Sequence, residues 1–143
     1  NLFKIDNVFF TYEVLDENNK NSTMHHRYEQ IFKRYSKLLS KAERVSRGSK
    51  KILFFQYGGD LSISSDLANE LSHKFPDKII VVVYITGVKA NISVRGENIR
   101  GLVLKAIEDL QDASGGGHKD AVGAQVKVED LEKFRGNLNK SAV

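Results

Sequence analysis

The stretch IIVVVYITGVKANISVR (residues 79–95) decides the fold. Its first part, residues 79–85, is an unbroken apolar run of strand length, typical of a central strand that is buried on both faces of a sheet. Apolar and polar residues then alternate, which places Val88 on the apolar face of a second strand and Ser93 and Arg95 together on its polar face. Because a tight turn joins the two segments, the second strand should pair antiparallel with the first.

The segments before this stretch predict a strand and a helix. Residues 51–57 are rich in strand formers and are followed by Gly58-Gly59. A helix is expected through residues 67–75, with Pro76 at its end and with Ser62, Ser64 and Ser65 as candidate N-caps. Strand, helix and buried strand in succession indicate a βαβ unit with a parallel strand pair.

The segments after the stretch predict further elements of the same domain. Residues 98–111 carry apolar side chains at helical spacing, residues 124–128 alternate like a short strand, and residues 131–138 support a short helix. A glycine-rich segment joins the first two and is expected to be a loop. The sequence therefore predicts an α/β fold in which a mixed β-sheet of about four to five strands is flanked by helices.

The amino-terminal third is different in character. Residues 3–14 are β-like, and residues 16–23 are polar and expected to form a loop. A strong amphipathic helix follows and ends near Gly48, which suits a C-terminal cap. Its apolar stripe includes three aromatic residues whose spacing assigns them to the core before any role in base stacking: Tyr28, Phe32 and Tyr35. We divide the chain into residues 1–47 and residues 48–143.

Composition excludes several classes of protein. The 143 residues contain no cysteine, which excludes a disulfide scaffold, a thiol nucleophile and cysteine-ligated metals. The apolar runs are too short for a membrane span of roughly 18 residues, so no membrane partner is expected. We expect a cytoplasmic protein, since the absence of cysteine fits a reducing compartment.

The net charge of +4 is unevenly distributed. The segment from Lys20 to Lys51 contains ten basic and two acidic residues and carries +8, so the other residues together carry −4. Such asymmetry is consistent with a face that binds a polyanion. It is also consistent with the solvated outer face of a helix. Both interpretations remain open at this point.

Three successive glycines before a histidine are the strongest candidate for chemistry. Gly115, Gly116 and Gly117 have no Cβ, so their backbone N–H groups can approach an anion closely, and His118 can donate to a phosphate oxygen. A helix beginning at Gly117 or His118 would add its dipole. The spacing matches neither the P-loop nor the dinucleotide fingerprint, and a flexible connector is the alternative.

Arg95 and Ser93 are the second candidate. Arginine presents a planar fork that matches phosphate, and a serine on the same strand face adds a hydroxyl. The alternative is a surface arginine near a strand end. His25-His26 is a poor metal pair, because adjacent side chains on a helix point about 100° apart. No metal site is expected in this chain.

Together, Ser93-Val94-Arg95 and the segment from Ser114 to Gly123 resemble the DHH-associated domain. This domain is the C-terminal, substrate-binding lobe of DHH-family phosphoesterases, of the RecJ-like exonuclease and exopolyphosphatase-related type. The family pattern is an S-x-R strand and a G-G-G-H-x-x-A-A-G segment, and Val122 replaces the second alanine here. The resemblance covers about residues 50–138.

The resemblance implies that six residues bind a phosphate of the substrate and that none is catalytic: Ser93, Arg95, Gly115, Gly116, Gly117 and His118. In the family, a separate lobe with an Asp-His-His motif holds two Mn²⁺ or Mg²⁺ ions. Met24-His25-His26 lacks the carboxylate, so no cofactor is expected in this chain, which should be inactive alone. The helix over residues 25–45 then corresponds to the connector between the lobes.

The leading hypothesis is therefore a substrate-binding lobe of a metal-dependent hydrolase, with single-stranded DNA or RNA, or a small phosphate, as its partner. The absent DHH catalytic lobe is the second expected partner. The alternative is a non-catalytic RecJ-like scaffold, whose basic helix would meet an acidic surface of a replication or repair protein. Substrate identity, polarity of digestion and oligomeric state do not follow from the sequence.

Overall fold

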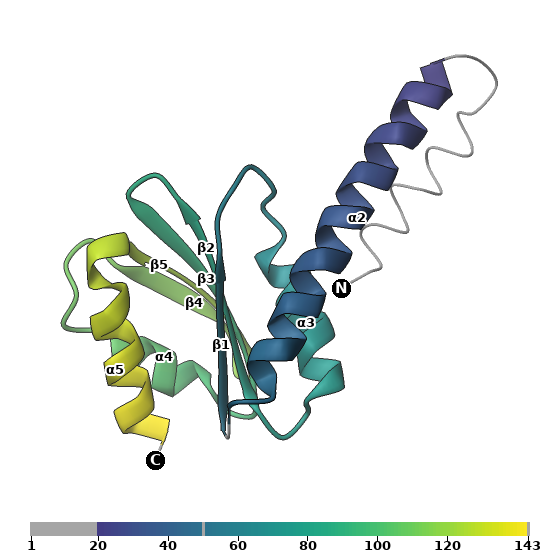
Figure 1. Cartoon of the computed structure of the whole chain (residues 1–143). Coiled ribbons are helices and arrows are strands. Elements are labelled where there is room, and N and C mark those ends of the chain that lie inside the picture. The colour runs from purple at the N-terminus through teal and green to yellow at the C-terminus, as the bar shows by residue number, and fades with distance from the viewer. Residues whose placement is uncertain (1–19, 50, 143) are drawn as a thin grey trace.

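The computed structural model describes residues 20–49 and 51–142 (Figure 1). The expected strand over residues 3–14 lies outside the described residues. The elements are α2 (Lys20–Ser46), β1 (Ile52–Tyr57), α3 (Ser64–Lys74), β2 (Ile79–Thr86), β3 (Lys89–Arg95), α4 (Arg100–Ile107), β4 (Ser114–His118), β5 (Ala121–Lys127), the 3₁₀ turn η1 (Val128–Asp130) and α5 (Leu131–Ala142).

The strands form one five-stranded mixed sheet in the order β1-β2-β3-β5-β4. β1 pairs parallel with β2, and the other neighbours pair antiparallel, including β2 with β3 across their tight turn. The α/β class, the mixed sheet and the βαβ unit predicted from the sequence are all confirmed. The run 79–85 lies in β2, between two strands, with residues 80–84 buried.

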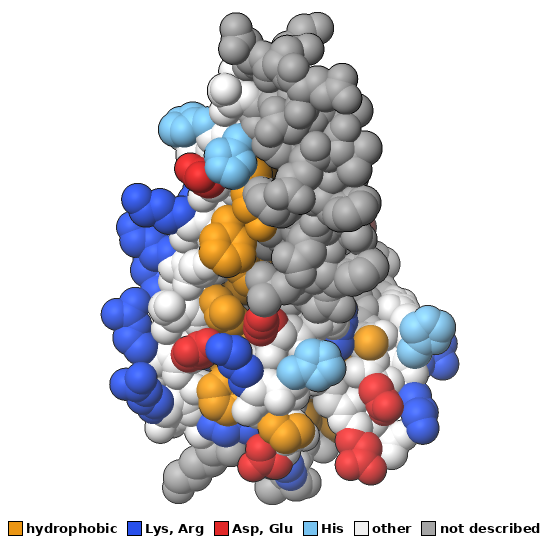
Figure 2. Space-filling model, turned by 90° about the vertical axis from the view of Figure 1, so that its right-hand side faces the viewer, with side chains coloured by type: hydrophobic (Ala, Val, Ile, Leu, Met, Phe, Trp, Pro, Cys, Tyr) orange, Lys and Arg blue, Asp and Glu red, His pale blue; other side chains and the backbone are white. Residues whose placement is uncertain are grey.

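Helices cover the two faces of the sheet in pairs. α2 and α3 lie on one side, and α4 and α5 lie on the other (Figure 1). α2 packs through its apolar stripe, in which Tyr35 is 1% exposed and Ala42 is fully buried. Tyr35 confirms the assignment of its stripe to the core, but Phe32 is 40% exposed. Figure 2 shows Lys and Arg side chains in a column beside this apolar band.

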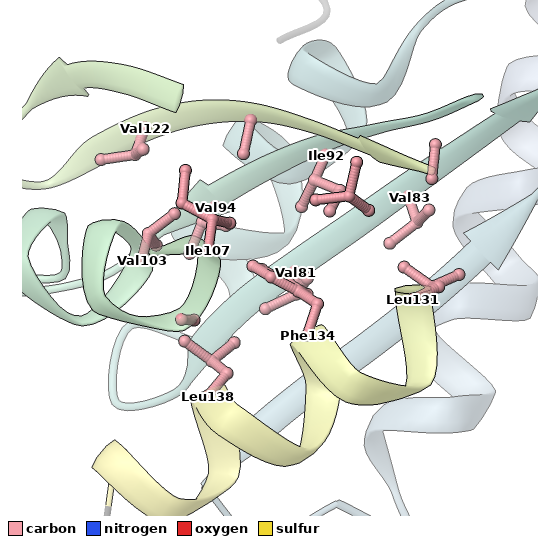
Figure 3. Packing of buried hydrophobic residues seen from close by; sticks show 14 of the residues in the cluster. Val81, Val83, Ile92, Val94, Val103, Ile107, Val122, Leu131, Phe134 and Leu138 are labelled. Atoms are coloured by element: carbon pink, nitrogen blue, oxygen red, sulfur yellow. The ribbon is translucent and has the colours of Figure 1, made fainter. Parts of the chain in front are cut away.

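The core under α4 and α5 is built from alternate residues of the strands. Phe134 and Leu138 of α5 belong to one buried cluster with Val81 and Val94 of the sheet (Figure 3). Burying a side chain of this size stabilises the fold by about 1.5–3 kcal/mol. The strand residues between these point to the opposite face, toward α3, and that alternation positions the site described below.

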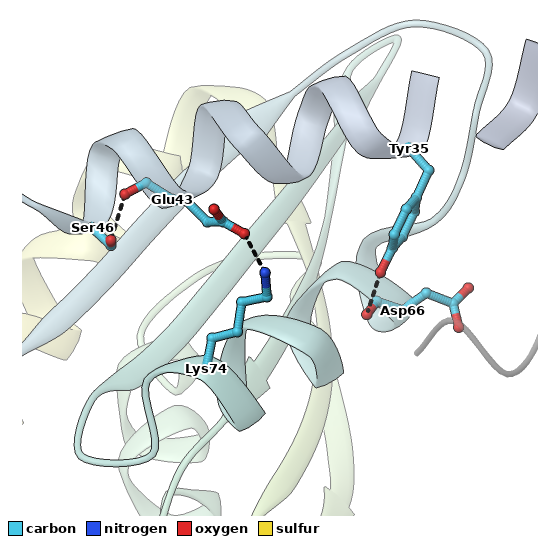
Figure 4. A network of polar contacts seen from close by, with 5 residues as sticks. All are labelled: Tyr35, Glu43, Ser46, Asp66 and Lys74. Carbon is cyan, nitrogen blue, oxygen red and sulfur yellow. Dashed lines mark hydrogen bonds and ion pairs between the residues drawn. The ribbon is translucent and has the colours of Figure 1, made fainter. Parts of the chain in front are cut away.

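Polar contacts fix α2 to the rest of the domain. Lys74 Nζ lies 2.7 Å from Glu43 Oε1, and the Tyr35 hydroxyl donates to the Asp66 carbonyl at 3.4 Å (Figure 4). Lys78 Nζ donates to the carbonyl oxygens of Ser46 and Ser49 at 2.7 and 2.8 Å. These carbonyls lie at the negative end of the helix dipole, so a cation stabilises the helix there.

Several helix boundaries differ from those predicted. α2 already begins at Lys20, inside the segment expected to be a loop. The N-cap of α3 is Ile63, which makes no side-chain cap bond, so the predicted serine caps are wrong. α4 is shorter than residues 98–111, since it runs only from Arg100 to Ile107. Asn98 delays its start, because the left-handed φ of 52° at that residue does not fit a helix.

Val88 is also misassigned by the alternation. It lies in the turn between β2 and β3 and is 75% exposed. The alternation holds only within the paired strand Lys89–Arg95, where neighbouring strands impose the pleat.

Candidate functional site

The glycine-histidine segment is an edge strand and not the expected loop. β4 pairs with β5 from Ser114 opposite Gln125 to His118 opposite Ala121. No helix begins at Gly117 or His118, so the proposed contribution of a helix dipole is wrong. An edge strand instead leaves a row of backbone N–H and C=O groups unpaired on its outer side.

The register of the sheet brings the predicted residues together. Arg95 is opposite Ala121 on β5, and Ala121 is opposite His118 on β4. Ser93 is linked in the same way through Gly123 to Gly116. Since neighbouring strands lie about 4.8 Å apart, the Cα atoms of Arg95 and His118 are about 10 Å apart.

Ser93, Arg95, Gly116 and His118 lie on the face that carries α3. On β3 and β5 the residues between them and their partners, Val94 and Val122, belong to the core on the other face, under α4 and α5. On the α3 side, next to Arg95, the surface of β5 and β4 is made by Ala121, Gly123, Gly116 and His118, and the last three are exposed. This half of the sheet is therefore an open platform with little side-chain bulk above it, and we call it the β4–β5 platform.

The three glycines have different structural roles. A Cβ on Gly115 would lie 3.1 Å from Ile107 and 3.2 Å from Ala124, because α4 packs closely over that position. Gly117 has φ of 147°, and a Cβ there would overlap the carbonyl oxygen of Ala121. A Cβ on Gly116 would meet nothing within 4 Å. Glycine at 117 is therefore required by the fold and glycine at 115 avoids a tight contact, whereas glycine at 116 leaves the platform open.

Arg95 is held at the border between the platform and α3. Its Nε donates to Asn69 Oδ1 at 2.7 Å, and its Nη1 donates to the Val94 carbonyl at 2.9 Å. Burial, opposed by the charge of Asp66, lowers the pKa of Arg95 from its ordinary value. An arginine remains protonated in proteins, so a partly buried cation is kept beside the open platform.

Ser93 is less accessible than the sequence suggests. Its side chain is only 8% exposed, and its hydroxyl donates to Ser64 Oγ at 3.2 Å. The hydroxyl proton is thus directed toward α3 in this structure. The oxygen keeps further capacity as an acceptor.

The turn between β4 and β5 is anchored to the loop before α4. Asp120 accepts the backbone N–H of Asn98 on its carboxylate at 2.9 Å and that of Gly96 on its carbonyl at 3.1 Å. The Lys119 carbonyl accepts the N–H of Arg100 at 3.2 Å. Backbone N–H groups at and before the start of α4 are therefore bound by the β4–β5 turn, and these bonds hold the turn next to His118 in place.

Two residues of the site escaped the sequence analysis. Asn69 lies on a helix with no motif around it, and only its contact with Arg95 identifies it. Asp120 is part of the glycine-histidine motif, where it stands in the position of the third glycine of a dinucleotide fingerprint. Its role as a backbone acceptor for a left-handed residue, Asn98, was not predictable from that comparison.

The described residues do not suit a Mn²⁺ or Mg²⁺ centre. Among them, no three His, Cys, Asp or Glu side chains lie close enough to share a metal ion. His25 pairs with Glu29 at 2.8 Å, and His26 Nε2 lies 3.2 Å from the Gln30 side-chain nitrogen. Within the same ranges, no helix is long and apolar enough to cross a membrane.

Comparison with known proteins gives a family and a fold. The family model described as the DHHA1 domain matches residues 48–142. RecJ from Thermus thermophilus, in complex with Mg²⁺, is similar with a TM-score of 0.65 and 16% identity, over 85% of this chain and 19% of that one. An exonuclease RecJ bound to manganese is similar with a TM-score of 0.66 and 17% identity, over 85% of this chain and 31% of that one. No curated protein matches the sequence.

Proposed function

The chain belongs to the DHHA1 domain family, and from this premise we propose that it is the phosphate-binding lobe of a DHH-family phosphoesterase. The chain spans under a third of either RecJ structure to which it is similar. The proposed ligand is the terminal or scissile phosphate of a single-stranded nucleic acid or of a small phosphate compound.

The open position at Gly116, in the row next to the one that holds Arg95 and His118, is the observation that carries this proposal. Glycine is not needed there for packing, whereas a phosphate approaching the backbone of an edge strand needs the absence of a side chain. Within the described part of the chain, two of the five N–H donors of Arg95 bind Asn69 and Val94. The other three are available for a ligand. His118 is exposed on the same face.

We assign no hydrolytic step to this chain. The two RecJ structures are complexes with Mg²⁺ and with manganese, and we propose that the parent protein uses one of these ions in a separate catalytic lobe. When bound, such an ion activates water for attack on phosphorus. Arg95 and His118 would hold the phosphate in place while that lobe acts.

A binding experiment tests the proposal. The chain should bind a 5′-phosphorylated dinucleotide more tightly than the same dinucleotide without the phosphate. The double variant Arg95→Ala, His118→Ala should lose this preference, because two charge-assisted contacts are worth about 1.5–3 kcal/mol each. The variant Arg135→Ala, His73→Ala removes the same residue types away from the platform and serves as the matched control. A phosphate preference that survives in the first variant would contradict the proposed site.

A further inference from the structure

A stripe of cations runs along the outer side of α2. It consists of six residues, all of which are exposed: Arg27, Lys33, Arg34, Lys37, Lys41 and Arg44. At about 100° per residue these positions fall within an arc of about 120° around the helix. From the first to the last residue the stripe is about 26 Å long, at 1.5 Å per residue. Figure 2 shows it as the column of Lys and Arg side chains along this helix. We call it the α2 basic stripe.

Acidic side chains of the helix lie outside this arc and are already engaged. Glu43 contacts Lys74 at 2.7 Å, and Glu29 contacts His25 at 2.8 Å. Within the stripe, Arg34 pairs with Asp60, which is itself highly exposed. Elsewhere along the stripe, the described residues provide no ion pair to neutralise the cations.

Like charges are repeated at helical spacing within the stripe. Lys37 has Lys33 and Lys41 four residues away on either side, and Arg34 lies three residues before it. Neighbours at these spacings repel each other and lower helix stability. An extended anion with regularly repeated charge would relieve this repulsion along the whole length of the stripe.

We propose that the α2 basic stripe binds the sugar–phosphate backbone of a nucleic-acid strand several nucleotides long. The proposal rests on the proposed function for the choice of a phosphate polymer, and it extends the bound part of the ligand from one phosphate to several nucleotides. No Phe, Tyr or Trp lies within the arc, and Phe32 lies on the far side of the helix. Protein-binding surfaces are rich in aromatic anchors and poor in lysine, so the bare row of cations favours a polyelectrolyte.

The hollow beside the stripe adds a second observation. A depression of about 430 Å³ lies between α2 and the loop after β1, lined by Arg27, Lys33 and Arg34 on the helix and by Asp60 and Leu61 on the loop. Three cations of the stripe thus border one concave surface. A phosphate backbone that follows the stripe would pass along its rim.

The test compares two triple variants of the full chain that lose the same charge. The stripe variant is Lys33→Gln, Lys37→Gln, Lys41→Gln, and Gln keeps a helix propensity close to that of Lys. The control is Lys105→Gln, Lys133→Gln, Lys140→Gln, on the exposed surface of α4 and α5. Both are titrated with 5′-phosphorylated dT20 and with the 5′-phosphorylated dinucleotide across a series of salt concentrations, with helicity checked by circular dichroism.

The stripe variant should bind dT20 at least about tenfold more weakly at low salt, and its log–log salt slope should fall by about 2, since each phosphate contact on a single strand contributes about 0.7. Its affinity for the dinucleotide should stay unchanged, and the control should keep both the dT20 affinity and the slope. Unchanged dT20 binding in the stripe variant, or an equal loss in the control, overturns the proposal. A 20-residue poly-glutamate that binds as tightly as dT20 overturns it in favour of an acidic protein.

Failure of the proposed function gives a different result. In that case the dinucleotide shows no dependence on Arg95 and His118, whatever the stripe variant does. The two proposals are therefore tested with different ligands and with different variants.

Discussion

Arg95 on β3 and Asn69 on α3 are joined by a hydrogen bond of 2.7 Å from Nε to Oδ1. Together with the bond from Nη1 to the Val94 carbonyl, it fixes the orientation of the partly buried guanidinium beside the β4–β5 platform. α3 therefore does more than cover the sheet, because its Asn69 orients Arg95, the residue proposed to bind the phosphate.

Asn69→Ala should weaken binding of the phosphorylated dinucleotide about five- to tenfold, since the arginine loses its fixed direction. The lost bond to a charged group should also lower the free energy of unfolding by about 1.5–3 kcal/mol. Isothermal titration and chemical denaturation measure the two effects.

Asn69→Asp separates position from charge. It keeps an acceptor for Arg95 and should restore most of the stability, but it places a carboxylate near the anion and should still weaken binding. Full binding in Asn69→Ala would show that Arg95 needs no positioning.

Substitutions of individual glycines should separate effects on folding from effects on binding. Gly116→Val should keep or raise the melting temperature, because the position is open and valine favours strands, while it blocks access to the platform and abolishes the phosphate preference. Gly101→Ala, at an open position on α4, is the control for an added side chain and should bind normally.

Gly117→Ala should instead destabilise the fold by about 1–3 kcal/mol, because the position combines a φ of 147° with an overlap on Ala121. Thermal unfolding of the three variants side by side gives the comparison. Equal destabilisation at 116 and 117 would contradict the separate roles.

Stability should fall at high pH through Tyr57. Burial raises the pKa of Tyr57 to about 12, even though its hydroxyl accepts the Ile63 N–H at 2.9 Å. A tyrosine has a pKa near 10 when unfolded. Because the folded pKa is the higher one, the stabilisation is complete below pH 10 and is lost as the pH rises through 12.

Tyr57→Phe should flatten this part of the pH profile. At neutral pH it should cost about 0.5–1.5 kcal/mol for the lost hydrogen bond. Denaturation midpoints of both proteins between pH 8 and 12 provide the measurement, and parallel profiles would contradict the assignment.

Lys78→Met should loosen the end of α2. The lysine donates to two carbonyls at the end of the helix and to Ser49 Oγ at 3.1 Å, so its loss should lower the free energy of unfolding by about 1–3 kcal/mol. Lys105→Met, at an exposed position on α4, is the control and should stay within about 0.5 kcal/mol of the starting protein.

Most of the architecture was predictable from apolar periodicity. The unbroken run of β2 and the alternation in β3 correspond to burial on two faces and to a pleat with period 2, so strand identity and direction followed from residues alone. Boundaries were less predictable. Asn98, which delays the start of α4, takes its left-handed backbone angle in a loop that Asp120 holds from 22 residues away.

The candidate residues were also visible in the chain, because an S-x-R strand and three glycines before a histidine are rare enough to be noticed without coordinates. Their arrangement was not visible. Glycine has no side chain to mark a strand period, so β4 has no apolar pattern, and only its backbone pairing with β5 makes it a strand. That pairing places Gly116 opposite Gly123 and His118 in one row with Arg95, while α4 leaves little room for a side chain at 115. The sequence alone thus identifies the residue types of the site. Which glycines serve the fold (115 and 117) and which leaves room for a ligand (116) depends on contacts between segments far apart in the chain.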